Sequence, residues 1–175
     1  GTVPTARLGS GTASSSTFLR GDSTFQSIAT SPVSFFKVHN AVNTNAQSTG
    51  SNSWTNFISL TWTPSSANSK HIFMISVGGV RKSGTNTSVG IRHAAAVSGG
   101  STYIYYPIKE TGYSGGGDMD TNQVGYHHYF NQTHSGNQIT LDVQFNSMQN
   151  QGTAAVKVNG DQAEIIVLEY ISSDQ

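Results

Sequence analysis

The chain has 175 residues and only 18 charged side chains, nine basic and nine acidic, so its formal net charge is zero. Ser, Thr, Asn, Gln and Gly make up 86 of the residues, and these neutral groups keep the chain soluble. We expect neither a nucleic-acid partner nor membrane insertion, because there is no basic stripe and no apolar run of roughly 20 residues. The absence of cysteine excludes disulfides and thiolate zinc sites.

The first 32 residues are expected to form an extended connector. Their scattered apolar residues show no period of 2 or 3.6, so the segment has no core of its own. From residue 33 to 175 the pattern changes to short apolar or alternating runs separated by Gly, Ser and Asn clusters. That pattern is typical of an all-β sandwich or barrel, and no amphipathic helix is visible.

Nine strands are predicted in this second region. A short strand is expected at 154–158, before an Asn159-Gly160 pair that suits a tight hairpin turn. The eight principal strands are expected at residues 33–39, 54–62, 71–78, 88–96, 102–107, 124–131, 138–145 and 163–171.

Two of these strands, "HIFMISV" and "EIIVLEYI", are apolar on both faces. In the second strand Ile166, Leu168 and Tyr170 point one way, while Ile165 and Val167 point the other. A sandwich strand normally has the core on one side and water on the other. We therefore expect a partner subunit to cover Ile166, Leu168 and Tyr170. The alternative is that the N-terminal segment packs over them.

Two polar motifs suggest metal binding, but neither is complete, and we expect no bound metal. Asp118, Asp120 and Asn122 have the spacing of a calcium loop, yet the loop's glycine and its bidentate glutamate are both missing. His127 and His128 are adjacent in a strand and point to opposite faces, so they cannot chelate one ion together. One of them could still meet its symmetry mates on a threefold axis.

Nothing in the sequence indicates an enzyme or a cofactor. There is no nucleophile elbow, no HExxH motif and no close glutamate pair, and Asp118 and Asp120 lack the apolar surroundings that raise a carboxyl pKa. Tyrosines are the stronger signal, because their rings can stack on sugars. Six of them fall between residues 103 and 129: Tyr103, Tyr105, Tyr106, Tyr113, Tyr126 and Tyr129.

The segment "RLGSGTASSSTFLRGDSTFQSI" resembles a recurrent segment of tailed-bacteriophage fibre and virion structural proteins. The resemblance implies that Phe18, Leu19 and Phe25 pack around a trimer axis and that Gly21 makes a turn between them. It makes Arg20-Gly21-Asp22 a structural turn rather than an integrin ligand. The family commonly has glycine at the position of Ser23, so a turn that needs glycine there would be lost.

The segments "WTNFISLTWTPSSANSKHIFMISVGG" and "AEIIVLEYI" resemble the head domains of the same fibres, notably those of marine phages. The resemblance implies a jelly-roll β-sandwich like the heads of tumour necrosis factor and complement, assembled as a homotrimer. The implied function is non-catalytic host adhesion at the tail-fibre tip of a virion, joined to the rest of the phage fibre. The receptor would be a bacterial surface glycan or an outer-membrane protein.

The alternative function is a purely structural virion protein, such as a capsid decoration or baseplate part, and more remotely a depolymerase.

The receptor site is expected at the end of the sandwich that lies away from the connector. Counting strands places the connections 40–53, 79–87, 108–123 and 146–162 there, and they are longer than the three at the near end. Long loops on a rigid scaffold usually carry binding, although a groove between subunits is an alternative. The expected contact residues are Arg81, Lys82, Asn86, Tyr113, Asp118, Asp120, Asn150 and Gln151.

Overall fold

The computed structural model describes residues 4, 7–27, 33–84, 86–114, 117–149 and 152–172. Within these ranges, the side chains of 33–36, 107–114, 122 and 172 lie outside the description. The chain divides into an N-terminal unit, residues 1–34, and a larger unit, residues 35–172. The boundary predicted from the sequence lies two residues earlier, between residues 32 and 33.

The N-terminal unit, predicted to be an extended connector, contains a short β-hairpin. Strand β1 (Thr17–Leu19) pairs antiparallel with β2 (Phe25–Ser27), and Ser10 bridges to the turn beside them. Phe18 and Leu19 are 48% and 43% exposed within the chain. Backbone pairing and close turns hold this small unit together, and its apolar side chains are left partly uncovered.

Gly21 lies in the turn of this hairpin, as predicted, and Ser23 is the residue of this turn with a positive φ. Ser23 adopts φ 60°, in the left-handed region, and its N–H donates to the Arg20 carbonyl at 3.0 Å. Asp22 Oδ1 accepts hydrogen bonds from the backbone N–H and the hydroxyl of Thr24, at 3.1 and 2.6 Å. Serine therefore adopts here a left-handed conformation that glycine usually occupies.

Alanine at Gly9 is expected to unfold the hairpin, whereas alanine at Gly21 is not. A Cβ on Gly9 would lie 2.0 Å from the Ser23 carbonyl oxygen, and a Cβ on Gly21 would meet nothing within 4 Å. NMR contacts between Leu19 and Phe25 across the strands should disappear in Gly9→Ala and persist in Gly21→Ala. Equal spectra for both variants would show that Gly9 is not packed against the turn.

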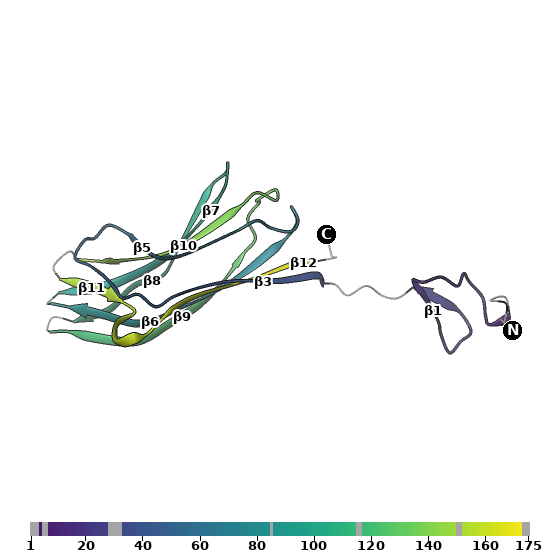
Figure 1. Cartoon of the computed structure of the whole chain (residues 1–175), viewed down its shortest axis with the longest axis horizontal. Helices are drawn as coiled ribbons and strands as arrows, with labels where there is room; N and C mark the ends of the chain where they lie inside the picture. The colour runs from purple at the N-terminus through teal and green to yellow at the C-terminus, as the bar shows by residue number, and fades with distance from the viewer. Residues whose placement is uncertain are drawn as a thin grey trace. The chain divides into compact units, whose positions relative to one another are not determined.

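The larger unit is a sandwich of two antiparallel sheets (Figure 1). One sheet has the order β5-β10-β7-β8, and in the other β12 lies between β3 and β6, while β9 pairs with the far side of β6. The bounds are β3 Val33–Asn43, β5 Thr55–Trp62, β6 Lys70–Ser83, β7 Thr87–Val97, β8 Thr102–Ser114, β9 Met119–Phe130, β10 Ile139–Ser147 and β12 Ala163–Ser172.

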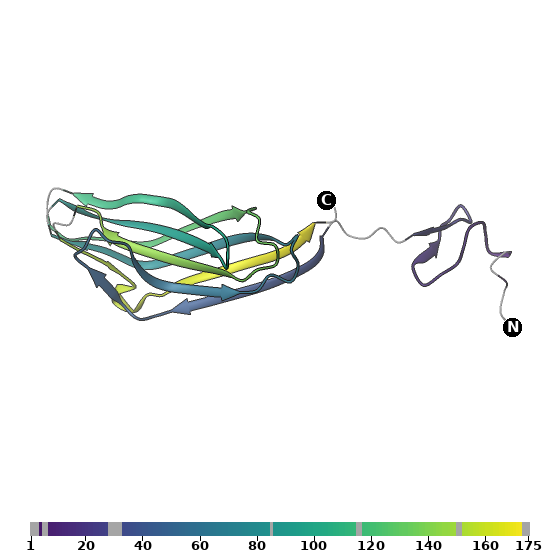
Figure 2. The same ribbon diagram turned by 90° about the horizontal axis from the view of Figure 1, so that it is seen from above.

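Numbered one to eight along the chain, these strands form sheets with the orders 1-8-3-6 and 2-7-4-5, which is the jelly-roll arrangement. The predicted all-β jelly roll is confirmed. Two short strands, β4 (Gln47–Thr49) and β11 (Thr153–Val156), belong to the sheet that contains β6. β11 pairs with β6 beyond the end of β12, and β4 pairs with β11. A 3₁₀ turn (Val158–Gly160) follows β11. Figure 2 shows β3 and β12 side by side along this sheet.

All nine predicted strands are present, but seven of them are longer than predicted, and β3 runs to residue 43 instead of 39. β6 and β7 run into the predicted loop 79–87, and β8 and β9 run into 108–123. The remaining connections are residues 84–86 and 115–118, so the predicted long loops are wrong at these two places. Backbone pairing continues through these strand ends. The apolar alternation stops there because paired polar side chains, such as Arg81 and Asp120, take the place of apolar ones.

The inner face of β6 changes parity at a glycine pair. His71, Phe73, Ile75 and Val77 point into the sandwich, but beyond Gly78-Gly79 the buried side chains are those of Val80 and Lys82. Gly79 has φ 54°, and a Cβ there would lie 2.4 Å from the Val158 carbonyl oxygen. The strand can turn its face at this point only because both residues lack a side chain.

The core lies between the sheets, and β12 confirms the predicted two-sided pattern. Ile165 and Val167 are fully buried in the core, whereas Ile166, Leu168 and Tyr170 lie half-buried on the outer surface of the sheet. Each large apolar side chain buried between the sheets contributes about 1.5–3 kcal/mol. The outward residues make no such contribution within one chain.

Candidate functional site

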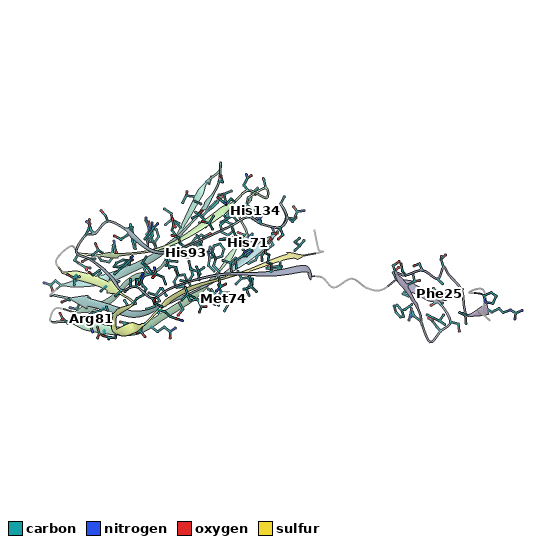
Figure 3. The ribbon with its side chains drawn as sticks, in the orientation of Figure 1. Phe25, His71, Met74, Arg81, His93 and His134 are labelled. Atoms are coloured by element: carbon teal, nitrogen blue, oxygen red, sulfur yellow. The ribbon has the colours of Figure 1, made fainter. Side chains whose placement is uncertain are left out.

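The outer surface of the β3-β12-β6-β9 sheet carries a concentration of apolar side chains, which we call the apolar face. Its members are Val38 and Val42 of β3, Ile72 and Met74 of β6, Tyr129 of β9, and Ile166, Leu168 and Tyr170 of β12. Val38, Val42, Met74 and Tyr129 are each 45–52% exposed. Figure 3 shows Met74 on this side of the sandwich. The sequence analysis found the β12 residues and missed those of β3 and β9.

The apolar face is hollowed where β9 has a glycine. A hollow of about 490 Å³ lies over Gly125, between Met74, His127 and Ile166. A second hollow of about 500 Å³ adjoins it and is lined by polar side chains, including Asp161 and Glu164. The surface therefore combines apolar side chains with a concave shape.

The outer surface of the β5-β10-β7-β8 sheet, which we call the polar face, has the opposite character. Side chains pair across its strands: Ser59 donates to Asp142 at 2.6 Å, and Thr61 and Thr140 hydroxyls lie 3.0 Å apart. Gln144 donates to Asn56 at 2.5 Å. These side chains therefore satisfy hydrogen bonds with one another across the strands.

The predicted receptor residues of β6 and β9 lie at the end of the sandwich opposite to the start of β3, where Figure 3 labels Arg81. The structure brings Arg81 and Asp120 together as a bidentate pair, at 2.5 and 2.9 Å. Asp118 accepts from the Ser83 hydroxyl at 2.8 Å and from the Gly84 N–H at 3.2 Å. These hydrogen bonds hold the pKa of both aspartates below the usual range.

Of the other predicted receptor residues, the structure describes the side chains of Lys82 and Asn86. The Lys82 side chain is buried, and its ammonium donates to the Gly84 carbonyl at 2.7 Å, so its prediction as a receptor contact is wrong. Asn86, with φ 53°, lies in the short turn between β6 and β7. The Tyr113 side chain, and Asn150 and Gln151, lie outside the described residues.

In the described part of the chain, no three His, Asp or Glu side chains gather in a way that could hold a metal ion. His127 is exposed on the outer surface, and His128 points inward, as the strand alternation predicts. His128 Nδ1 lies 3.0 Å from His93 Nε2, inside the sandwich. Burial, followed by the neighbouring His128, lowers the pKa of His93 to about 3.

A buried polar network occupies the opposite end of the core. The Glu169 carboxylate is fully buried and accepts from the Ser65 N–H at 2.5 Å and the Ser69 hydroxyl at 2.7 Å. His39 Nε2 lies 2.8 Å from its other oxygen. Burial raises the pKa of Glu169, but these hydrogen bonds together outweigh it and bring that pKa to about 2. The strand alternation in "EIIVLEYI" places Glu169 inward with Ile165, and this signal could have identified it.

His71 lies beside this network with both ring nitrogens lacking a hydrogen-bond partner among the described residues. It packs against the rings of Trp62 and His134, and Figure 3 labels both histidines at this end. Burial, and then the nearby His134, lower the pKa of His71 to about 4. The imidazole is therefore neutral in the folded protein at neutral pH.

Within the described ranges, no helix has the length and apolar composition that crossing a bilayer requires.

Comparisons with known proteins identify no family for this chain. No protein-family model matches the sequence, and no curated protein matches it. Among solved structures, the VP2 subviral particle of infectious bursal disease virus matches at a TM-score of 0.47 and 12% identity, over 85% of this chain and 40% of that chain. The Gt strain of the same virus matches at 0.47 and 12%, over 86% and 45%. The chain spans less than half of those proteins, and nothing about its function follows from so distant a likeness.

Proposed function

We propose that this chain is the head of a virion fibre, a homotrimeric jelly roll that assembles through the apolar face. The observation that carries this proposal is the clustering of half-exposed apolar side chains on one outer surface of the sandwich. A lone chain leaves that surface in water, at a cost of about 25 cal/mol for each Å² of apolar area. Self-association removes the cost, and obligate interfaces have this core-like composition.

The N-terminal unit supports the same assembly. Its segment resembles the connectors of phage fibres, and Phe18 and Leu19 are nearly half exposed on the β1 hairpin. Several copies packed around one axis would cover these side chains. The threefold symmetry, and the place of the domain at a tail-fibre tip joined to the rest of the fibre, rest on the sequence resemblance.

Within this assembly we assign the chain to host adhesion, as a non-catalytic binder of a bacterial surface glycan or outer-membrane protein. A trimer built through the apolar face leaves the polar face and the strand ends available. A purely structural virion part is the second candidate. Two observations favour it. The connections 84–86 and 115–118 are short, and Arg81 and Asp120 on the adjoining strands already form hydrogen bonds with each other.

Two measurements test this function. Multi-angle light scattering at micromolar concentration is expected to give close to three times the 18.6 kDa of one chain. Fluorescently labelled protein is expected to stain cells of the host and to compete with adsorption of the parent phage. A trimer that stains no host cell supports the structural candidate. A stable monomer contradicts the assembly itself.

A further inference from the structure

An arginine packs against two aromatic rings that also contact each other on the polar face, near the start of β5. The Arg92 guanidinium carbon lies 4.5 Å from the Trp54 ring centroid and 5.7 Å from the Tyr106 ring centroid. Its Nε donates to the Gln144 side-chain oxygen at 2.5 Å, and its Nη1 donates to the Tyr106 hydroxyl at 3.2 Å. Four independent contacts therefore fix the plane of this guanidinium.

The charge of Arg92 is not balanced by an acid among the described side chains, in which no carboxylate lies within ion-pair distance of it. Arg81, by contrast, is paired bidentately with Asp120. A planar guanidinium with open donors matches a carboxylate in a two-point geometry. Arg92 thus presents a fixed cationic group on an otherwise neutral hydrogen-bonding surface.

The residues around Arg92 suit a sugar. Tyr106 is 49% exposed, and its ring offers a flat apolar surface of the kind that sugar rings stack on. Asn56 and Gln144 lie next to Arg92 in the same cross-strand row and offer amide donors and acceptors for hydroxyl groups. Because the mutual hydrogen bonds already order these side chains, binding would cost little conformational entropy.

A slot adjoins this cluster at the edge between β8 and β9. It has a volume of about 190 Å³, and Tyr106 lines both the slot and the Arg92 cluster. The other lining residues are His93, Tyr105, Tyr126, His127 and His128. Within the described residues, the buried Tyr126 hydroxyl and His93 Nδ1 lack a hydrogen-bond partner. Both atoms are almost fully buried, so what the slot adds to the cluster is its concave shape beside Tyr106.

From these observations we propose that the Trp54–Arg92–Tyr106 cluster and its slot form a binding site for a glycan that carries a carboxylate. The carboxylate meets Arg92, a sugar ring lies on Tyr106, and hydroxyl groups meet Asn56 and Gln144. This inference rests on the proposed adhesive function and moves its receptor site from the strand ends to the polar face. That face stays outside when copies pack through the apolar face on the other sheet.

The test is binding of the purified protein to an array of bacterial surface polysaccharides, each printed in its native and its carboxyl-reduced form. At least one acidic polysaccharide is expected to bind, and reduction of its carboxyl groups should weaken binding at least tenfold. Arg92→Gln and Tyr106→Ala should each weaken binding at least tenfold with an unchanged trimer mass. Arg81→Gln is the matched control, because Arg81 is paired with Asp120 at the strand ends, and it should change binding less than twofold.

Three outcomes overturn the site: no acidic polysaccharide bound, equal binding to carboxyl-reduced material, or binding that survives Arg92→Gln. Staining of host cells separates this failure from failure of the proposed function. If labelled protein stains cells and Arg92→Gln stains them equally, adhesion stands and the site is elsewhere. If neither protein stains cells, adhesion itself fails.

Discussion

Met74→Glu is expected to convert the trimer into a folded monomer. Met74 lies at the middle of the apolar face, pairs in register with Ile166 on one side and His127 on the other, and is 45% exposed in a single chain. In an interface through this face, a glutamate would be buried in every copy of the trimer, beside Ile166 and the His127 imidazole instead of a lysine or arginine. Truly unpaired buried charges cost several kcal/mol each, which is enough to abolish association at micromolar concentration.

The monomer should keep its fold because Met74 points away from the core. The circular dichroism spectrum of Met74→Glu should therefore match the wild type while its scattering mass falls to that of one chain. Ile104→Glu is the matched control, since Ile104 is 43% exposed on the polar face. Ile104→Glu is expected to remain trimeric. A trimeric Met74→Glu would place the interface on another surface.

The sequence predicted this surface only in part, for reasons that are visible in the strands. In β12 the alternation is uninterrupted, so the outward position of Ile166 and Leu168 follows from spacing alone. Val38 and Tyr129 belong to strands in which polar residues surround the apolar ones. Their common location appears only when β3 and β9 are placed in one sheet, and that placement depends on long-range pairing.

The ends of β6 and β9 were predicted wrongly for a different reason. Sequence reasoning took polar residues after Gly79 as a loop, yet β6 continues to Ser83 because β9 and β11 supply backbone partners. The parity change at Gly78-Gly79 then turns Lys82 inward and Arg81 outward. Adjacent basic residues that look equivalent in the sequence have opposite environments, and no local pattern reports this.

The proposed glycan site shows the same limit of sequence-based prediction. The tyrosine cluster indicated sugar binding, and Tyr106 is its half-exposed member on the polar face. Nothing in the spacing of Trp54, Arg92 and Tyr106 brings them together, because they come from three parts of the chain. Their meeting depends on the order in which β10, β7 and β8 pair.

Glu169→Ala is expected to cause a large loss of stability. Removal of the fully buried carboxylate would leave the Ser65 N–H, the Ser69 hydroxyl and His39 without their acceptor. Breaking a buried charged network in this way costs about 3–5 kcal/mol. Glu169→Gln should cost less, since its amide oxygen can still accept from Ser65 and Ser69. Chemical denaturation at pH 7 and a fixed protein concentration measures both values.

The pH dependence of the free energy of unfolding shows whether the charge on Glu169 stabilises the fold. The pKa of Glu169 is about 2 in the folded protein, below its ordinary value of 4.5, so the unfolded chain binds the proton more readily. The stabilisation from the charged carboxylate is therefore complete above about pH 4.5 and declines as the pH falls toward 2. Over that window the free energy of unfolding loses up to about 1.4 kcal/mol for each pH unit.

The difference between the wild type and Glu169→Gln isolates this effect from the rest of the molecule. Both proteins also lose stability below pH 6.5, because His71 and His93 stay neutral in the fold while the unfolded chain takes up protons. That loss is common to both and largely cancels in the difference, although Glu169 raises the pKa of His71 slightly. The difference should stay constant from pH 7 to about 5 and shrink as the pH is lowered to 3.

Asp142→Asn, on the polar face, is the matched control and is expected to change stability by less than about 0.5 kcal/mol. A difference that grows with acid would mean that the fold raises the pKa of Glu169 above its ordinary value instead of lowering it.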